Sequence, residues 1–293
     1  MTETNTTILT KDRLFKRCPV CLDAALMATS EVLPEGPLLK CASCGQFLSS
    51  CTTAQHDAAL WKWDVAGGTE PGARSAARYR KVSERRLTTS IKLLHTGSPS
   101  PHLLDVGCSS GSLLTVASNI GLSVSGVEPA ALAAETAQKN GFNVYAGYLH
   151  QAAYPSDHFD IVTLFEIVEH LSDPASLVAE CRRVLKPGGI LAINTPNAAS
   201  WTAKFMGARW EGFSLTGLGG HASFFTPGSM RSLARVSRLQ IAKTETRNVR
   251  FYEKGQCHPA VFRAAKILAQ LLAFPARIFG QGHDLLVFMR KEA

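Results

Sequence analysis

The sequence predicts an α/β protein with a doubly wound, largely parallel sheet and a small cysteine-rich module in front of it. Three observations support this fold class. From about residue 99 onward, short apolar runs alternate with segments of helical periodicity, and such alternation builds parallel sheets. Before that point, four of the eight cysteines fall in two C-x-x-C pairs. The 293 residues suffice for one full domain and one small one.

The N-terminal module, residues 11–55, is defined by Cys18, Cys21, Cys41 and Cys44. The first ten residues show no secretory signal, so we interpret the pairs as metal ligands rather than disulfides. Four thiolates at this spacing make a closed tetrahedral Zn²⁺ site, and the zinc should therefore be structural. Apolar runs at 27–33 and 38–40, around a Pro-Glu-Gly-Pro turn, predict a β-hairpin that carries the two knuckles of a zinc ribbon.

Residues 56–98 are expected to form a linker and a basic helix. Gly67–Gly72 indicates a flexible junction, and a helical pattern runs from Ala73 to His95. Its apolar side carries Tyr79, Val82, Leu87, Ile91 and Leu94, and its predicted outer side carries Arg74, Arg78, Lys81, Arg85 and Arg86. We favour a solvated face, with an anion-binding face for a nucleotide-linked substrate or RNA phosphate as the alternative.

The remaining chain, residues 99–293, alternates strands and helices. Strands are predicted at 102–106, 123–127, 143–146, 159–165, 189–194, 239–249 and 284–289, and helices at 112–120, 130–140, 174–185 and 259–272. We expect the apolar side of the last helix to pack on the sheet, with a membrane surface as the alternative. No segment has the roughly 18 apolar residues of a spanning helix, so a soluble, cytoplasmic protein is expected.

The first predicted strand ends in Asp105-Val106-Gly107-Cys108-Ser109-Ser110-Gly111. Glycine lets a ligand approach the backbone at such a strand-to-helix turn. A dinucleotide fingerprint would require glycine at Ser109 and Ser112, which argues against a dehydrogenase. Glu128 ends the next strand, where a carboxylate can accept both hydroxyls of a ribose; a solvated loop glutamate is the alternative.

Four segments taken together resemble the class I S-adenosylmethionine-dependent methyltransferases, and most of all the branch that contains the ubiquinone-biosynthesis O-methyltransferases. They read LLDVGCSSGSLL, SGVEPAALAAETAQKNG, FDIVTLFEIVEHLSDP and RRVLKPGGILAINTPN, and the resemblance covers Leu103 to about Ala242. The resemblance implies a Rossmann-like seven-stranded sheet closed by an antiparallel hairpin. It also implies S-adenosylmethionine as cofactor.

The resemblance further implies a role for each matching residue. The methionyl end of the cofactor would lie on Asp105, Gly107, Cys108 and Gly111, the ribose on Glu128 and Pro129, and the adenine beside Tyr148 and Leu149, while Phe165 and Glu166 would line the passage to the acceptor. Ser109 stands where the family usually has glycine.

Two histidines are candidate general bases, His221 ahead of His170, and a structural role is the alternative for both. His221 lies in a segment, residues 197–226, that covers the substrate in this branch. This predicted lid carries aromatic residues and a Gly217–Gly220 hinge, which suits an apolar or sugar-like acceptor. The alternative is an insertion that packs on the domain's own core.

The sequence thus predicts methyl transfer to the oxygen of a small molecule or nucleotide sugar. The net charge of +8 and the ribbon leave RNA methylation as an alternative. Against RNA, the fifth strand ends in Asn194-Thr195-Pro196-Asn197, not in an Asn-Pro-Pro-Tyr-like motif. A ribbon adaptor with an inactive methyltransferase fold is the non-enzymatic alternative, and the retained Gly107, Gly111 and Glu128 argue against it.

Overall fold

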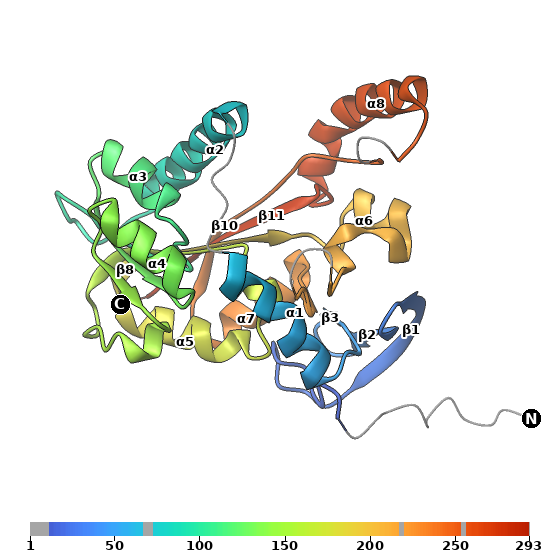
Figure 1. Cartoon of the computed structure of the whole chain (residues 1–293), viewed down its shortest axis with the longest axis horizontal. Coiled ribbons are helices and arrows are strands. Elements are labelled where there is room, and N and C mark those ends of the chain that lie inside the picture. The colour runs from blue at the N-terminus through green and yellow to red at the C-terminus, as the bar shows by residue number, and fades with distance from the viewer. Residues whose placement is uncertain (1–11, 67–72, 217–219, 253–255, 293) are drawn as a thin grey trace, which may run out of the picture.

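A seven-stranded sheet forms the centre of the protein, which is described by a computed structural model at residues 12–66, 73–216, 220–252 and 256–292 (Figure 1). The predicted Gly67–Gly72 junction and most of the Gly217–Gly220 hinge lie outside these residues. The strand order is β10-β11-β8-β7-β4-β5-β6. The strands are β4 (His102–Val106), β5 (Ser123–Glu128), β6 (Val144–Ala146), β7 (Phe159–Phe165), β8 (Leu185–Pro196), β10 (Gln240–Arg247) and β11 (Asp284–Arg290). Only β11 runs antiparallel to its neighbours, so the predicted Rossmann-like sheet and its closing hairpin are confirmed.

Helices cover both faces of this sheet because adjacent strand residues point to opposite sides. Leu103 and Ile161 pack with one group of helices, α2 (Ala73–Lys92), α3 (Ser112–Asn119) and α4 (Ala131–Lys139). Their neighbours Leu104 and Val162 pack with the other group, α5 (Pro174–Val184) and α7 (Pro227–Val236). Ligands of doubly wound folds bind at the carboxyl ends of the parallel strands, between such layers.

The N-terminal module forms a second, four-stranded sheet of order β1-β2-β3-β9. Its strands are β1 (Leu26–Leu33), β2 (Gly36–Cys41), β3 (Phe47–Leu48) and β9 (Ser223–Phe224). The predicted hairpin is confirmed by the antiparallel pairing of β1 and β2. The last strand, β9, comes from the predicted lid and pairs with β3 through Leu48↔Ser223. The ribbon and the lid therefore share one sheet.

Helices α1, α6 and α8 differ from the sequence prediction. Helix α1 (Thr53–Ala66) was not predicted, although Thr52 and Gln55 exchange the hydrogen bonds of a capping box at its start. Helix α6 (Trp201–Met206) opens the predicted lid. Helix α8 (Pro259–Ile278) continues past the predicted end at Leu272.

The expectation that the apolar side of α8 packs on the sheet was wrong. The residues of α8 buried against the protein are Ala269 and Ala276. Its large apolar side chains, including Leu271 and Phe274, point to solvent. None of the described helices is long and apolar enough to cross a membrane.

Candidate functional site

The glycine-rich turn after β4 is built on backbone conformations that favour glycine. Gly107 and Gly111 have φ values of +77° and +88°. A Cβ on Gly107 would lie 2.3 Å from Cδ1 of Ile167, so any other residue would have to displace Ile167 as well as adopt a positive φ. Ser109 also adopts a left-handed conformation, and its N–H donates to Oε2 of Glu128 at 2.8 Å. This bond ties the turn to the end of the neighbouring strand.

Two buried carboxyl groups lie beside this turn. Glu128 accepts from the N–H groups of Ser109 and Ala130, at 2.8 and 2.9 Å. Asp105 accepts from Oγ1 of Thr163 at 2.6 Å, and burial raises its pKa to about 7, with the charge of Glu128 adding to the shift. A glycine-rich turn with carboxylates at adjacent strand ends matches what the polar groups of an adenosyl ligand require.

The other predicted cofactor residues differ in how they face this edge. The Cys108 thiol is buried against Gly126, where a Cβ would lie 2.6 Å from Sγ, so Cys108 can offer only backbone to a ligand. Pro129 is exposed, and Leu149 is buried. The side chain of Tyr148 is 59% exposed and stacks with His150. Tyr148 therefore has a flat surface open for an adenine ring.

A series of hydrogen-bonded polar side chains lies at the ends of β7 and β8. Arg86 donates to Oδ1 of Asn194 at 2.7 Å, and the amide nitrogen of Asn194 donates to Glu166. The guanidinium carbon of Arg86 lies 5.0 Å from the ring centroid of Phe165. The prediction that Arg86 faces outward was therefore wrong, because this contact draws it into the site. Burial raises the pKa of Glu166, while the Arg86 charge opposes that shift.

Arg85 was also predicted to face outward and does not. It forms an ion pair with the buried Glu245 of β10 at 2.9 Å. One turn of α2 thus attaches the helix to two strands of the sheet, through Arg86 at β8 and Arg85 at β10.

Glu169, His170 and His221 form a compact cluster at the same edge. The rings of His170 and His221 are 4.7 Å apart, and Oγ1 of Thr195 donates to Glu169 at 2.9 Å. Burial, reinforced by the charge of Glu166, raises the pKa of Glu169 well above its usual range. One ligand atom from each member of the cluster lies within 4.8 Å of the others, close enough for a metal ion as well as for proton transfer.

The tautomer of His221 follows from its hydrogen bond. Nδ1 lies 3.2 Å from the carbonyl oxygen of Gly212, which can only accept, so Nδ1 carries the proton. Nε2 of the neutral ring is then the acceptor. Burial lowers the pKa of His221, which keeps the ring neutral near pH 7.

The helix after the ribbon and the segment before β9, the lid strand that pairs with the ribbon, both contact this cluster. His56 of α1 is buried, and its Nε2 donates to the carbonyl oxygen of His170 at 2.9 Å. The N–H of Ala222, beside β9, donates to the carbonyl oxygen of Glu169 at 2.9 Å. No sequence pattern indicates a role for His56, because the contact joins residues 114 positions apart.

The four predicted zinc ligands come together. The sulfur atoms of Cys18 and Cys44 are 3.5 Å apart, as are those of Cys21 and Cys41. All four lie within 4.8 Å of one another. Tetrahedral coordination at Zn–S distances near 2.3 Å places sulfurs about 3.8 Å apart, so the four cysteines could hold zinc.

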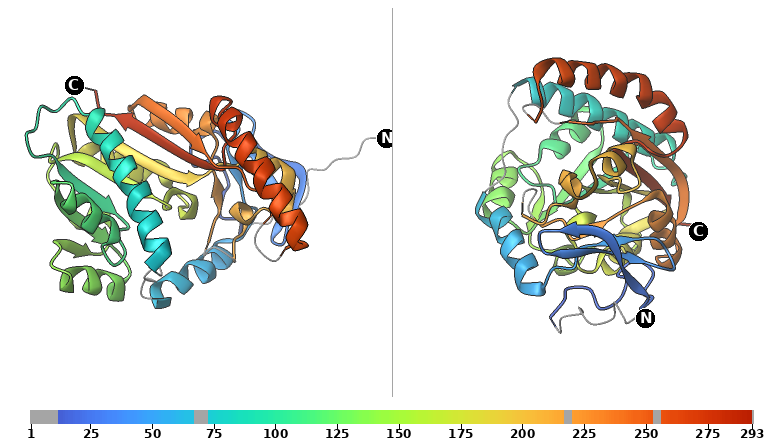
Figure 2. Two further views of the ribbon diagram at one scale, coloured as in Figure 1. Left: turned by 90° about the horizontal axis from the view of Figure 1, so that it is seen from above. Right: turned by 90° about the vertical axis from the view of Figure 1, so that its right-hand side faces the viewer.

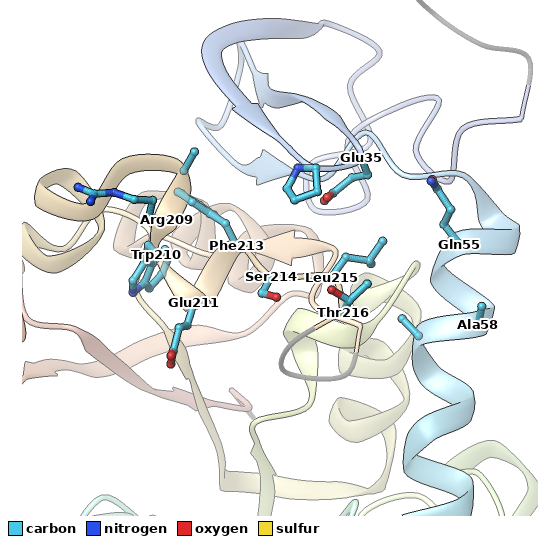
Figure 3. Close-up of a pocket in the computed structure, with 13 residues that line it drawn as sticks. Glu35, Gln55, Ala58, Arg209, Trp210, Glu211, Phe213, Ser214, Leu215 and Thr216 are labelled. Carbon is cyan, nitrogen blue, oxygen red and sulfur yellow. The ribbon is translucent and has the colours of Figure 1, made fainter. Parts of the chain in front are cut away.

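Some residues of the predicted lid pack in a hydrophobic core, and others line a cavity. Trp210 and Phe213 are buried and pack with Phe224 of the ribbon sheet, which is the alternative role considered above. A cavity of about 560 Å³ lies between the lid, the ribbon and α1 (Figure 3). In Figure 3, Glu35 and Gln55 line it from one side, and residues 214–216 line it from the other.

The methyltransferase domain family matches residues 76–241 of this chain. The ubiquinone biosynthesis O-methyltransferase of Thiobacillus denitrificans is 33% identical over 150 residues, covering 47% of this chain and 64% of that protein. The enzyme of the same name from Xanthomonas oryzae pv. oryzae is 31% identical over 190 residues, covering 61% and 75%. The chain thus spans less than two thirds of the first of these relatives.

Solved structures agree on the fold. A SAM-dependent methyltransferase from Archaeoglobus fulgidus superposes with a TM-score of 0.51 at 18% identity, covering 72% of this chain and 94% of that one. A SAM-dependent methyltransferase from Leishmania major gives a TM-score of 0.52 at 13% identity, covering 81% and 83%. With the glycine turn, the strand order and the matched domain, this chain belongs to the class I S-adenosylmethionine-dependent methyltransferase family.

Proposed function

We propose that the protein transfers a methyl group from S-adenosylmethionine to a hydroxyl oxygen of a small-molecule or sugar acceptor in the cytoplasm. The observation that carries this proposal is the adjacency of two sets of groups at one sheet edge. The glycine turn and Glu128 lie at the ends of β4 and β5, and the cluster of Glu169, His170 and His221 lies at the ends of β7 and β8. The relatives named as ubiquinone biosynthesis O-methyltransferases support oxygen as the acceptor atom.

The chain's residues would hold the cofactor from two sides. Glu128 would accept the ribose hydroxyls, and the Gly107–Gly111 turn would contact the methionyl end beside Asp105. Tyr148 would pack on the adenine, and Phe165 would border the passage to the acceptor. The bound cofactor supplies an activated sulfonium methyl, so the protein's main tasks are alignment and exclusion of water.

The acceptor hydroxyl must also lose its proton. In the proposed step, Nε2 of His221 takes that proton as the oxygen attacks the methyl carbon. The new C–O bond would form as the C–S bond breaks, and the sulfur of the cofactor would keep the electron pair of the broken bond. Arg86 and the Glu166–Asn194 pair would orient the acceptor, because they border the same edge.

RNA is the weaker alternative. The basic face of α2 was its main support beside the ribbon, and two of its arginines are engaged within the protein, Arg85 with Glu245 and Arg86 with Asn194. That engagement leaves fewer cations for phosphate than the sequence suggested.

Methyl transfer from labelled S-adenosylmethionine to three acceptor sets tests the proposal: catechols and other small hydroxylated compounds, nucleotide sugars, and total RNA. We expect labelled product in one of the first two sets and none in RNA. Label in RNA alone, sensitive to ribonuclease, would replace the proposal with RNA methylation.

A further inference from the structure

Helix α8 presents its large apolar side chains to solvent rather than to the protein. Ile267, Leu271, Phe274 and Ile278 are 60%, 71%, 72% and 65% exposed. These positions follow the spacing i, i+4, i+7, i+11, which places them on one face of a helix. The opposite face, which contacts the protein, carries Ala269 and Ala276. An ordinary surface helix has the reverse arrangement.

The charges of α8 have one sign. Arg263, Lys266 and Arg277 are its ionisable residues, and α8 contains no acidic residue. At 100° per residue, all three fall on the same flank of the apolar stripe. None of the three forms an ion pair within the part of the chain that the structure describes. They are therefore available to anionic groups outside the protein.

A cavity lined by cations borders this face. Arg78 of α2 and Lys266 of α8 line one cavity of about 500 Å³. Both helices project on the same side of the molecule (Figures 1 and 2). The cavity is large enough for a phosphate head group, and Arg250, which follows β10, lines it together with these two cations.

We propose that α8 docks this protein on an anionic lipid surface, with the Ile267–Ile278 stripe in the interface and the basic flank among the head groups. An exposed apolar face beside Lys and Arg alone is the pattern of helices that lie in the plane of a membrane interface. The long side chains of lysine and arginine can reach the head groups while the apolar stripe is buried. The proposal does not depend on which acceptor is methylated.

A second copy of the chain fits the same face less well. Two α8 helices packed against each other would bring six cations together, and α8 offers no carboxylate to pair with them. Anionic lipids supply both the apolar phase and the negative charge. Charge complementarity therefore selects the lipid surface as the occupant.

Flotation with vesicles tests this directly. We expect the full-length protein to float with phosphatidylcholine vesicles that contain phosphatidylglycerol and to remain behind with phosphatidylcholine alone. The double variant Leu271→Ser, Phe274→Ser should lose roughly tenfold or more in binding, since two exposed apolar side chains leave the interface. The matched control is Leu132→Ser on α4, a leucine with 56% exposure, which should bind as the wild type does.

Neutralising the cations of α8 tests the electrostatic contribution to vesicle binding. Arg263→Gln, Lys266→Gln and Arg277→Gln together should abolish the preference for anionic vesicles, while Lys139→Gln, Arg231→Gln and Arg235→Gln should keep it. Phe274→Trp should show a blue-shifted emission on binding, and Leu132→Trp should not.

The proposal is overturned if the folded wild type fails to float with anionic vesicles, or if the Leu271, Phe274 variant floats as well as the wild type. A dimer in sedimentation would also overturn the proposal if the double variant is monomeric and anionic vesicles do not dissociate the wild-type dimer. The occupant of this face would then be a second copy of the chain.

Discussion

His56 and His170 are joined by a hydrogen bond of 2.9 Å from Nε2 of His56 to the backbone oxygen of His170. His56 belongs to the first helix after the ribbon, and His170 lies in the turn after β7 that carries Glu166 and Glu169. Together with the β3–β9 pairing, this bond connects the ribbon and the helix after it to the turn that carries Glu169 and His170. A structural zinc site would thus stabilise the geometry of residues more than a hundred positions away.

Replacing His56 tests whether this attachment positions the catalytic turn. We expect His56→Ala to lower kcat by roughly tenfold or more, because small displacements of reacting groups have large rate effects. The Kd for S-adenosylmethionine should stay unchanged, since the glycine turn is on other strands. His95→Ala, at an exposed histidine, is the control. A kcat equal to that of the wild type would show that the bond is dispensable.

Loss of a zinc ligand should weaken the hydrogen bonds across the sheet that the ribbon and the lid share. We expect Cys41→Ser to release zinc and to speed hydrogen exchange at the N–H of Ser49 and of Ala222, because these donate between the ribbon, the lid and Glu169. Exchange in β4 and β5 should remain slow. Cys257→Ser is the matched control. Unchanged exchange at Ala222 would mean that the ribbon does not hold the lid in place.

Glu245 should dominate the acid sensitivity of the fold. Burial raises its pKa, but the bonds and charges of Lys243 and Arg247 outweigh burial and lower it to about 2. A folded-state pKa below the usual 4.5 stabilises the protein above pH 4.5, and this stabilisation is lost as the pH falls toward 2. Glu245→Gln should therefore lower the free energy of unfolding at pH 7 by about 2 kcal/mol, allowing for its partly exposed partners.

Denaturant titrations at pH 7 and pH 2.5 measure this difference, which should shrink at the lower pH. The control is Glu135→Gln, whose partner Lys139 is 71% exposed and whose pair should contribute little. Equal effects of the two substitutions at pH 7 would contradict the special role of Glu245.

The proposed base, His221, predicts a pH profile. A base must be neutral to accept a proton, and burial lowers the pKa of His221 below its usual 6.5. We expect kcat to be constant above pH 6.5 and to fall at lower pH as the ring becomes protonated. His221→Asn should reduce kcat by about 10²-fold or more and remove that acidic limb.

His95→Asn serves as the control for the pH profile. An acidic limb that persists in His221→Asn would exclude this residue as the base. If the rate instead required added Mg²⁺ or Mn²⁺, a cation on Glu169, His170 and His221 would take the place of the base.

The sequence was most informative where a local pattern determines a local structure. The Gly107 and Gly111 turn, the strand that ends in Glu128 and the four clustered cysteines were all predicted, because each depends on neighbours in the chain or on a fixed spacing. The parallel, doubly wound character of the sheet followed from the βα alternation. These features required no knowledge of distant contacts.

What the sequence did not predict depends on tertiary packing. Arg86 reads as an exposed residue of a basic helix, and only the approach of α2 to β8 brings it onto Phe165 and Asn194. The pairing of β9 with β3 involves two residues on each strand, too few for a periodic signal. The outward face of α8 has the composition of a buried helix, so hydropathy alone assigned it to the core.

The most direct test of the account is calorimetric titration with S-adenosylmethionine, S-adenosylhomocysteine and NAD on the wild type, Glu128→Ala and Glu135→Ala. We expect both adenosyl ligands to bind and NAD not to bind. Glu128→Ala should weaken the binding of the adenosyl ligands by roughly 10²-fold, and Glu135→Ala should have no effect. Folded protein that binds neither adenosyl ligand, or a Glu128→Ala variant with full affinity, would contradict the assignment of this edge as the cofactor site.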